Sequence, residues 1–246
     1  MAVLDKVYKK YGNDLKLEVI TKKDTKVVYH LKSKQGDFIL FVIPDITPSK
    51  FQKYMRSQGV QQRLVKDGFN AAPIEMVYYQ DKTIIAVHRK LAGSKNYERN
   101  AHTMLITGRL IGKLHRMTTG KEYKKDAPFM PHPNILARLV LALRDTFIKR
   151  IPAYFTYFKF RDFPQGICHR DLIIGNVLID DEDNACLIDY DKHRYMPFVV
   201  GIVYFYNKHL KDKKLIKDFL KGYQQELPLT PKEIAYLKAN IGEDCL

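Results

Sequence analysis

The chain of 246 residues is long enough for one large domain or two small lobes, and its hydrophobic content of 46% excludes a disordered protein. Its net charge of +15 (42 Lys and Arg against 27 Asp and Glu) attracts anions such as nucleotides, phosphosugars, acidic lipids or nucleic acid, although a solvated lysine-rich surface is the simpler explanation. No apolar run approaches the ~20 residues of a membrane span, the first residues lack an apolar signal core, and three cysteines without metal-type spacing fit a reducing cytoplasm.

Residues 15–88 are predicted to form a small lobe made of five strands and one helix. β-Branched or alternating runs bounded by polar turns predict the strands. They are expected at 15–21, 27–32, 37–43, 74–79 and 83–88. Between the third and fourth of them, apolar spacing predicts a helix over 49–66, with Ser49 as its N-cap.

The remaining chain is predicted to be mainly helical. Apolar side chains recur at helical spacing over 102–117, 134–151 and 208–223. A fourth helix is expected to begin after Thr230, because Thr suits the N-cap position, the following Pro suits the first helical position and Glu233 completes a capping box.

The most specific pattern of the chain is a set of polar side chains at fixed intervals. Asp171 is followed by Asn176 five positions on, and by Asp189 thirteen further. Two short apolar runs, 176–179 and 186–188, are separated by an acidic turn, which predicts a β-hairpin. Such a hairpin can bring the polar groups that flank its strands to one point.

These side chains suit the transfer of a phosphoryl group from ATP to a hydroxyl. That reaction needs the hydroxyl to be aligned and the phosphate charge to be neutralised by Mg²⁺, which prefers hard oxygen ligands. Asn176 and Asp189 supply such oxygens, and Asp171 is free to accept a hydrogen bond from the attacking hydroxyl. His169 is expected to brace the loop. The alternative interpretation is an ordinary hairpin with surface acids.

The pattern His169-x-Asp171-x-x-x-x-Asn176, followed by Ile188-Asp189, resembles the catalytic and metal-binding loops of the protein-kinase-like superfamily. The similarity is closest to its aminoglycoside phosphotransferase and choline-kinase-like branch. It implies a two-lobed α+β fold, with a five-stranded N-lobe carrying one helix and a mainly helical C-lobe. It also implies ATP and Mg²⁺ as cofactors, Asp171 and His169 as catalytic residues, and Asn176 and Asp189 as Mg²⁺ ligands.

The same resemblance divides the chain into an N-lobe over 1–88, a hinge over 89–93 and a C-lobe over 94–246. In the similar kinases the hinge passes the adenine and binds it through the main chain. His88 and Lys90 are therefore expected to contact the nucleotide.

One strand departs from the family pattern. A kinase of this superfamily usually has a basic residue in its third strand, directed at the phosphates, but Phe41 stands near that position. Lys32, one strand earlier, Lys50 and Lys53 are the candidates for its replacement, and Lys32 is taken as a nucleotide-binding residue. The helix over 49–66 also lacks the glutamate that would pair with such a lysine.

Three functions are consistent with these observations. The first is ATP-dependent phosphorylation of a hydroxyl on a small molecule or sugar. The second is a lipopolysaccharide core sugar (Kdo or heptose) kinase, because 168–172 and 188–192 also resemble those bacterial enzymes and the basic charge suits work beside anionic lipid. The third is a pseudokinase-type binding protein, suggested by Phe41 and the missing glutamate.

The expected partners are a nucleotide and a small-molecule or sugar acceptor, with peripheral contact to an anionic membrane. Nucleic acid is disfavoured, because the chain shows no C₂H₂ spacing, no aromatic RNA-binding strand and no long basic arm. The predicted location is the cytoplasm, including the inner face of the membrane.

Overall fold

The computed structural model describes residues 4–93, 97–120, 123 and 162–246. The chain divides into two compact units, Met1–Lys95 with Val177–Asp191 (unit 1) and Asn96–Asn176 with Lys192–Leu246 (unit 2). Each unit is described by itself, and the division into lobes 1–88 and 94–246 stays a prediction. The helix expected over 134–151 lies outside the described residues.

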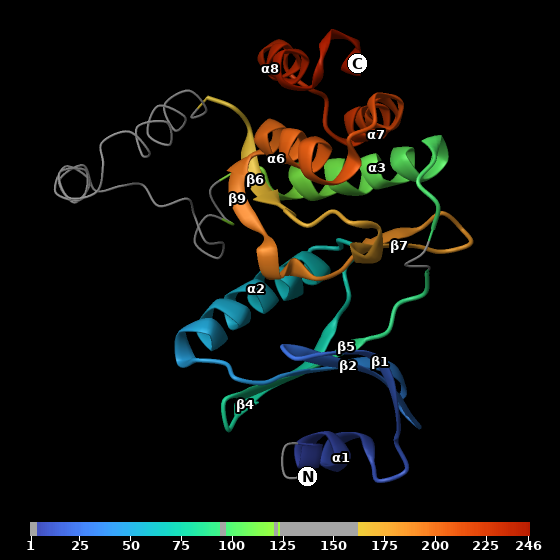
Figure 1. Cartoon of the computed structure of the whole chain (residues 1–246), viewed down its shortest axis with the longest axis vertical. Helices are drawn as coiled ribbons and strands as arrows, with labels where there is room; N and C mark the ends of the chain where they lie inside the picture. Colours follow the sequence, from blue (N-terminus) through green and yellow to red (C-terminus); the bar gives the residue numbers. More distant parts are fainter. Residues whose placement is uncertain (1–3, 94–96, 121–122, 124–161) are drawn as a thin grey trace, which may run out of the picture. The chain divides into compact units, whose positions relative to one another are not determined.

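Unit 1 is built on a five-stranded antiparallel sheet in the order β1-β2-β3-β5-β4 (Figure 1). The strands are β1 (Lys16–Lys23), β2 (Lys26–Ser33), β3 (Gly36–Ile43), β4 (Ile74–Gln80) and β5 (Thr83–Arg89). All five predicted strands are confirmed, because alternating or β-branched runs bounded by polar turns are a strong local signal for strands.

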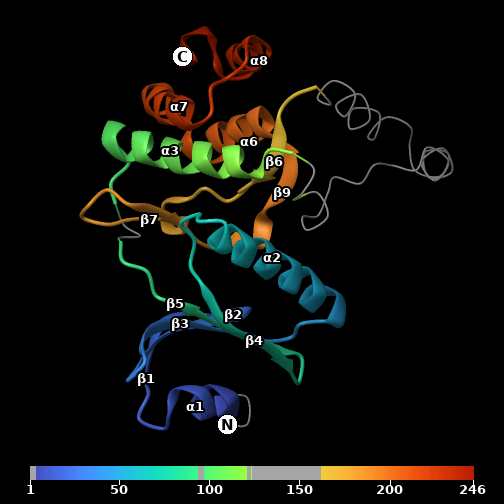
Figure 2. The ribbon, with the colours of Figure 1, turned by 180° about the vertical axis from the view of Figure 1, so that it is seen from behind.

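Two helices lie on opposite sides of this sheet, α1 (Asp5–Tyr11) and α2 (Pro48–Lys66) (Figures 1 and 2). The short α1 was not predicted; it covers one face, where Val7 and Tyr11 join buried side chains of β2, β3 and β5. The predicted α2 is confirmed, but its N-cap is Thr47, whose hydroxyl accepts from the Lys50 amide. Ser49 was the wrong N-cap because a Pro at the first helical position starts the helix earlier.

The predicted hairpin is present as β7 (Val177–Ile179) and β8 (Ala185–Leu187). It belongs to unit 1, although the 81 residues 96–176 separate it in sequence from Lys95, where the preceding segment of that unit ends. The amide of Leu187 donates to the carbonyl of Asn70 at 3.0 Å, and the side chain of Asn70 donates to the carbonyl of Ala185 at 3.1 Å. These two hydrogen bonds attach β8, the strand that leads to Asp189, to Asn70 within unit 1.

Unit 2 is mainly helical in its described part, and β6 and β9 form a two-stranded sheet within it. Its elements are α3 (Ala101–Thr118), β6 (Gln165–Cys168), β9 (Arg194–Pro197), α6 (Phe198–Phe205), α7 (Lys213–Glu226) and α8 (Pro231–Ile241). The predicted helices at 102–117 and after Thr230 are confirmed, the latter with the expected capping box.

Helices α3 and α7 pack closely against each other (Figures 1 and 2). A Cβ at Gly108 would lie 2.0 Å from the carbonyl oxygen of Phe219, and one at Gly222 would lie 2.0 Å from that of Leu105. Only glycine allows the two backbones to approach this far, so these two residues set the spacing of the helix pair.

The helix expected over 208–223 was predicted with a wrong start. Residues Tyr206–Leu210 form a π-helical turn that continues α6 and ends at Lys211, which adopts left-handed backbone angles. α7 begins after Asp212, whose carboxylate accepts from two amides of its first turn. The apolar spacing runs across this break, so periodicity alone did not reveal it. No helix in the described part of the chain is both long and apolar enough to span a membrane.

Candidate active site

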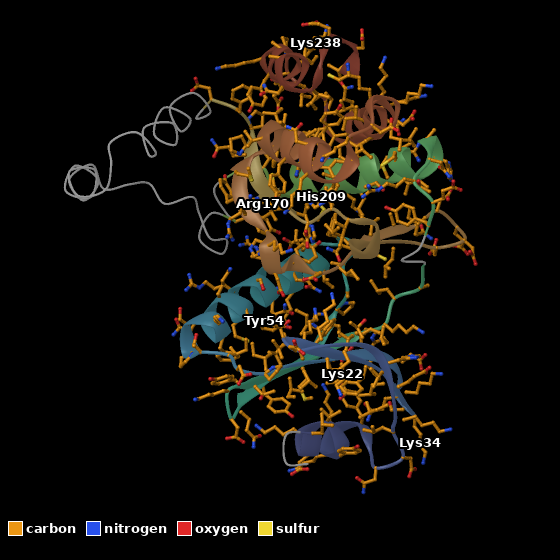
Figure 3. The ribbon with its side chains drawn as sticks, viewed as in Figure 1. Lys22, Lys34, Tyr54, Arg170, His209 and Lys238 are labelled. Atoms are coloured by element: carbon orange, nitrogen blue, oxygen red, sulfur yellow. The ribbon has the colours of Figure 1, made fainter. Side chains whose placement is uncertain are left out.

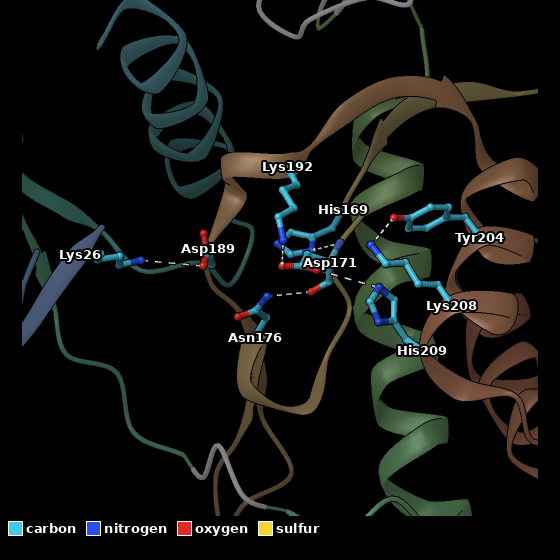
Figure 4. Close-up of polar contacts among 9 residues, drawn as sticks. All are labelled: Lys26, His169, Asp171, Asn176, Asp189, Lys192, Tyr204, Lys208 and His209. Carbon is cyan, nitrogen blue, oxygen red and sulfur yellow. Dashed lines mark hydrogen bonds and ion pairs between the residues drawn. The ribbon is translucent and has the colours of Figure 1, made fainter. Parts of the chain in front are cut away.

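The loop after β6 holds Asp171 in unit 2. The side-chain amide of Asn176, in the 3₁₀ turn Ile174–Asn176, donates to the Asp171 carbonyl at 2.7 Å. The Asp171 amide donates to Nδ1 of His169 at 3.4 Å. His169 and Asn176 are both buried, so the loop has one polar anchor on each side of Asp171 (Figure 4). The structure thus brings three of the predicted site residues together in one turn of chain.

A lysine and a histidine face the carboxylate of Asp171. Nζ of Lys192 lies 2.7 Å from its Oδ2, and Nε2 of His209 lies 3.9 Å from its Oδ1 (Figure 4). Burial raises the pKa of Asp171, but the hydrogen bond and charge of Lys192, with the charges of His169 and His209, lower that pKa overall. Asp171 is therefore an ionised carboxylate at neutral pH.

Arginine and lysine side chains continue outward from this loop. His209 lies on the π-helical turn, and its carbonyl accepts from the Arg99 guanidinium at 2.6 Å. The Arg170 guanidinium lies 4.5 Å from the centre of the Tyr204 ring, and Nζ of Lys208 donates to the Tyr204 hydroxyl at 2.6 Å (Figures 3 and 4). The surroundings of Asp171 in unit 2 are thus basic.

Asp189 lies in unit 1, just after β8. Its backbone φ is +64°, a conformation that is uncommon for a non-glycine residue and is found preferentially at functional sites. Its side chain is 38% exposed, and its Oδ2 lies 4.0 Å from Nζ of Lys26 at the start of β2 (Figure 4). A carboxylate held in a strained turn and open to solvent has the chemistry expected of a metal ligand.

A second carboxylate follows two residues later. The Asp191 Oδ1 accepts from the hydroxyl of Ser57, on α2, at 3.4 Å. Burial, and then the charge of Asp189, raise the pKa of Asp191 to about 6, against the lowering effect of Lys26, Ser57 and Lys53. The pair Asp189 and Asp191 therefore concentrates negative charge on unit 1.

His88 and Phe41 form the adjoining part of unit 1. Their rings lie 4.9 Å apart, and Nζ of Lys26 lies 4.5 Å from the centre of the Phe41 ring. His88 is buried, and its Nε2 has no hydrogen-bond partner among the described residues. Burial, with the charge of Lys26, lowers the pKa of His88 to about 4, so its ring is neutral at pH 7. A buried, unpartnered ring nitrogen is a group that a bound ligand could satisfy.

The other two predicted nucleotide-binding residues lie at a different part of the sheet. Lys90 Nζ is 3.8 Å from the carboxylate of Asp37. Lys32 is exposed and lies opposite Asp37 in the β2–β3 register. Neither is placed beside Asp189, whereas Lys26 is.

Of the predicted site residues, the structure groups Asp171, His169 and Asn176 in unit 2, and His88 and Asp189 in unit 1. Sequence reasoning missed Lys192 and His209 beside Asp171, and Lys26 beside Asp189. Lys192 follows the motif directly and could have been suspected. The other two come from distant strands and turns, which no local pattern connects to the motif.

Comparison with known proteins identifies the family of this chain. The model of a family described as the phosphotransferase enzyme family matches residues 22–234. No curated protein matches the chain in sequence.

Several solved structures share the fold. An aminoglycoside phosphotransferase from Alicyclobacillus acidocaldarius is 15% identical, with 94% of this chain and 80% of that chain covered and a TM-score of 0.63. A Plasmodium vivax ethanolamine kinase is 15% identical over 96% of this chain and 74% of that chain, with a TM-score of 0.63. A spectinomycin phosphotransferase, in complex with ADP and spectinomycin, is 13% identical over 96% and 83%, with a TM-score of 0.63. These similarities confirm the predicted α+β, protein-kinase-like fold.

Proposed function

Because this chain belongs to the phosphotransferase enzyme family, we propose that it transfers a phosphoryl group from ATP to a hydroxyl of a small molecule or sugar. Solved structures of the same fold support a nucleotide as the donor, since a spectinomycin phosphotransferase has been solved with ADP and with AMP. The acceptor class is drawn from the same comparison, in which the neighbours carry the names of aminoglycoside phosphotransferases and an ethanolamine kinase.

The observation that carries the proposal is the setting of Asp171. Its carboxylate is kept ionised by Lys192, and its backbone is held by His169 and Asn176. An ionised, fixed carboxylate can accept a hydrogen bond from the acceptor hydroxyl, align its oxygen and take its proton as the new phosphate ester bond forms. His169 acts in this scheme by holding the loop, because its Nδ1 is engaged with the Asp171 amide.

Asn176 and Asp189 are the residues that would hold Mg²⁺. When bound, this ion neutralises charge on the transferred phosphate. The Asn176 amide nitrogen is used by the Asp171 carbonyl, which leaves its oxygen as the ligand atom. His88, with its unpartnered Nε2, and Lys90 are assigned to the adenine side of the nucleotide.

The test is phosphate transfer from labelled ATP to a panel of amino alcohols, aminoglycosides and core sugars. Wild type is expected to label at least one hydroxyl compound, and Asp171→Asn is expected to lower that rate by about 10²–10⁴-fold, as for loss of a general base. Asp162→Asn, which removes an exposed carboxylate paired with Lys232, is the matched control and should keep the rate.

Unchanged turnover in Asp171→Asn would refute the assignment of the base. A wild-type protein whose melting temperature rises with ATP and Mg²⁺, but which labels no acceptor, would instead support the binding-protein alternative.

One observation favours the second candidate, a lipopolysaccharide core sugar kinase. A surface cavity of about 590 Å³ in unit 2 is lined by Val200, Val203, Tyr204, Asn207, Lys208 and Lys211. Two of these described residues are lysines and none is a carboxylate, and the Tyr204–His209 ring contact links the cavity to the Asp171 loop. A cationic lining suits an anionic sugar or lipid better than a cationic amino alcohol.

Binding to vesicles that contain anionic lipid distinguishes this candidate. We expect binding that weakens as salt is added, because screening shortens the reach of surface charge. Lys208→Glu with Lys211→Glu should reduce binding and the use of acidic sugars together. Equal use of amino alcohols and acidic sugars by wild type would favour a neutral or cationic acceptor.

A further inference from the structure

The third strand of the sheet carries no cation at the place where a kinase of this superfamily contacts the phosphates of ATP. Strand β3 (Gly36–Ile43) contains no lysine or arginine, and Phe41 stands at the relevant position. Helix α2 also contains no acidic residue that could orient such a lysine. A phenyl ring cannot neutralise phosphate, so the proposed reaction requires a cation from another element.

The structure supplies one from the neighbouring strand. Val28 is the cross-strand partner of Phe41, and Lys26 precedes Val28 by two residues, which places it on the same face of the sheet and diagonal to Phe41. Its ammonium lies over the Phe41 ring at 4.5 Å and reaches to 4.0 Å from the Asp189 carboxylate. These two contacts hold the positive charge of Lys26 above Phe41, the residue at the position of the usual third-strand lysine.

The alternative lysines are less well placed. Lys32 lies six residues further along β2, which is about 20 Å at ~3.3 Å per residue, and its register partner is Asp37. Lys50 lies in the exposed first turn of α2. Lys53 influences Asp191 but has no ion pair with Asp189 among the described residues. Lys26 alone among these four contacts the residue assigned to the metal.

We propose that Lys26 is the phosphate-contacting lysine of this enzyme, reaching from β2 across Phe41 to the place that a third-strand lysine fills in its relatives. The proposal rests on the proposed function, since it assumes that a nucleotide with its metal binds beside Asp189. Without nucleotide, Asp189 is the counter-ion of Lys26. The Lys26 side chain is 30% exposed, so on nucleotide binding its ammonium can turn to the phosphate oxygens without unpacking a core.

The Phe41 ring has a defined part in this arrangement. A cation over an aromatic face is stabilised by the ring quadrupole, and Nζ of Lys26 lies 4.5 Å from the centre of the Phe41 ring. Phe41 and Lys26 therefore act as a pair. Moving the positive charge from position 26 to position 41 is a direct test of this pairing.

The experiment compares four variants in nucleotide binding and in phosphate transfer. Lys26→Met keeps the side-chain length and removes the charge; Lys34→Met, at an exposed turn where Lys34 pairs with Asp14 (Figure 3), is the matched control. Lys26→Met with Phe41→Lys returns the charge from the third strand. Lys32→Met tests the rival lysine. Calorimetry with ADP and Mg²⁺ measures the dissociation constant, and labelled ATP measures turnover.

Lys26→Met is expected to weaken ADP binding by about tenfold and to lower turnover by about 10²–10³-fold, as for loss of one preorganised charge. Lys34→Met should match wild type, and the double variant should regain at least tenfold of the lost turnover. This recovery separates a charge effect from a folding defect, since a misfolded protein would gain nothing from a second substitution.

Binding and turnover of Lys26→Met within twofold of Lys34→Met, or a loss seen in Lys32→Met instead, would overturn the assignment while leaving the proposed function standing. A wild-type protein that binds no ADP and transfers no phosphate would remove both.

Discussion

Asp171 in unit 2 and Asp191 in unit 1 stand in opposite electrostatic settings. Asp171 faces Lys192 and His209, and its pKa is lowered. Asp191 is half-buried, and burial together with the charge of Asp189 raises its pKa to about 6. The same side-chain type is thus held ionised in one unit and pushed toward protonation in the other.

This difference matches what the two sites are proposed to do. A group that accepts a proton from a hydroxyl at neutral pH must first be ionised, and Lys192 beside Asp171 favours that state. A cation-binding site gains from adjacent like charges, which attract a divalent ion and repel each other in its absence. The contrast teaches that local charge, more than residue type, assigns roles to these acids.

After Asp171→Asn, the largest loss of turnover among these acids is expected for Asp189→Asn. Asparagine tolerates the left-handed backbone at this position, so the fold should be kept while a metal ligand loses its charge. We expect turnover to fall by about 10²–10³-fold and the Mg²⁺ concentration needed for half-maximal rate to rise. Asp183→Asn, also at φ +64° but on the exposed β7–β8 turn, is the matched control. Full activity of Asp189→Asn would contradict the metal assignment.

The next effect concerns the stability of unit 1. The folded pKa of Asp191, about 6, is above the ordinary value of 3.8. Its contribution to stability is therefore complete below the ordinary pKa and is lost as pH rises through about 6. Asp191→Asn stays neutral, so wild type should lose on the order of 2–3 kcal/mol relative to this variant between pH 4 and pH 7.

Urea unfolding of both proteins across that pH range measures the difference, with Asp181→Asn on the exposed hairpin turn as the control. If the difference in unfolding free energy between wild type and Asp191→Asn stays constant with pH, ionisation of Asp191 does not destabilise the folded protein.

The smallest effect is expected at Lys192. Removing its charge and hydrogen bond in Lys192→Met lets the pKa of Asp171 rise, so the acidic limb of kcat/KM should move to higher pH. Well above that limb the rate should fall only a few-fold, because exposed ion pairs are weak. Lys232→Met, an exposed lysine paired with Asp162, should leave the profile in place. An unmoved profile in Lys192→Met would mean that other cations hold Asp171 ionised.

Much of the fold could be predicted from local patterns. The five strands, the helices at α2, α3 and α8, and the β7–β8 hairpin all follow from periodicity, turn residues and caps within a few positions of each other. The short α1 and the π-helical turn could not, because elements of seven and five residues carry too little periodic signal. The start of α7 could not either, because the apolar spacing continues unbroken past the point where the helix is interrupted.

The candidate site divides in the same way. Asp171 and Asn176 are five positions apart, so the motif identified both residues, and the structure shows the hydrogen bond that joins them. The roles assigned to them and to Asp189 stay predictions until the variants are measured. The sequence motif did not reveal Lys26 beside Asp189. The position of Lys26 depends on which strand pairs with β3 and in which register.

The sequence by itself therefore determined the strands, the capped helices and the acidic motif, since each depends on residues that are neighbours along the chain. Tertiary structure alone decided that Lys26 covers Phe41, that Lys192 and His209 face Asp171, and that Gly108 and Gly222 bring α3 and α7 together. The physical reason is that charge pairing and close packing act through space over a few ångströms, whatever the distance between the partners in sequence.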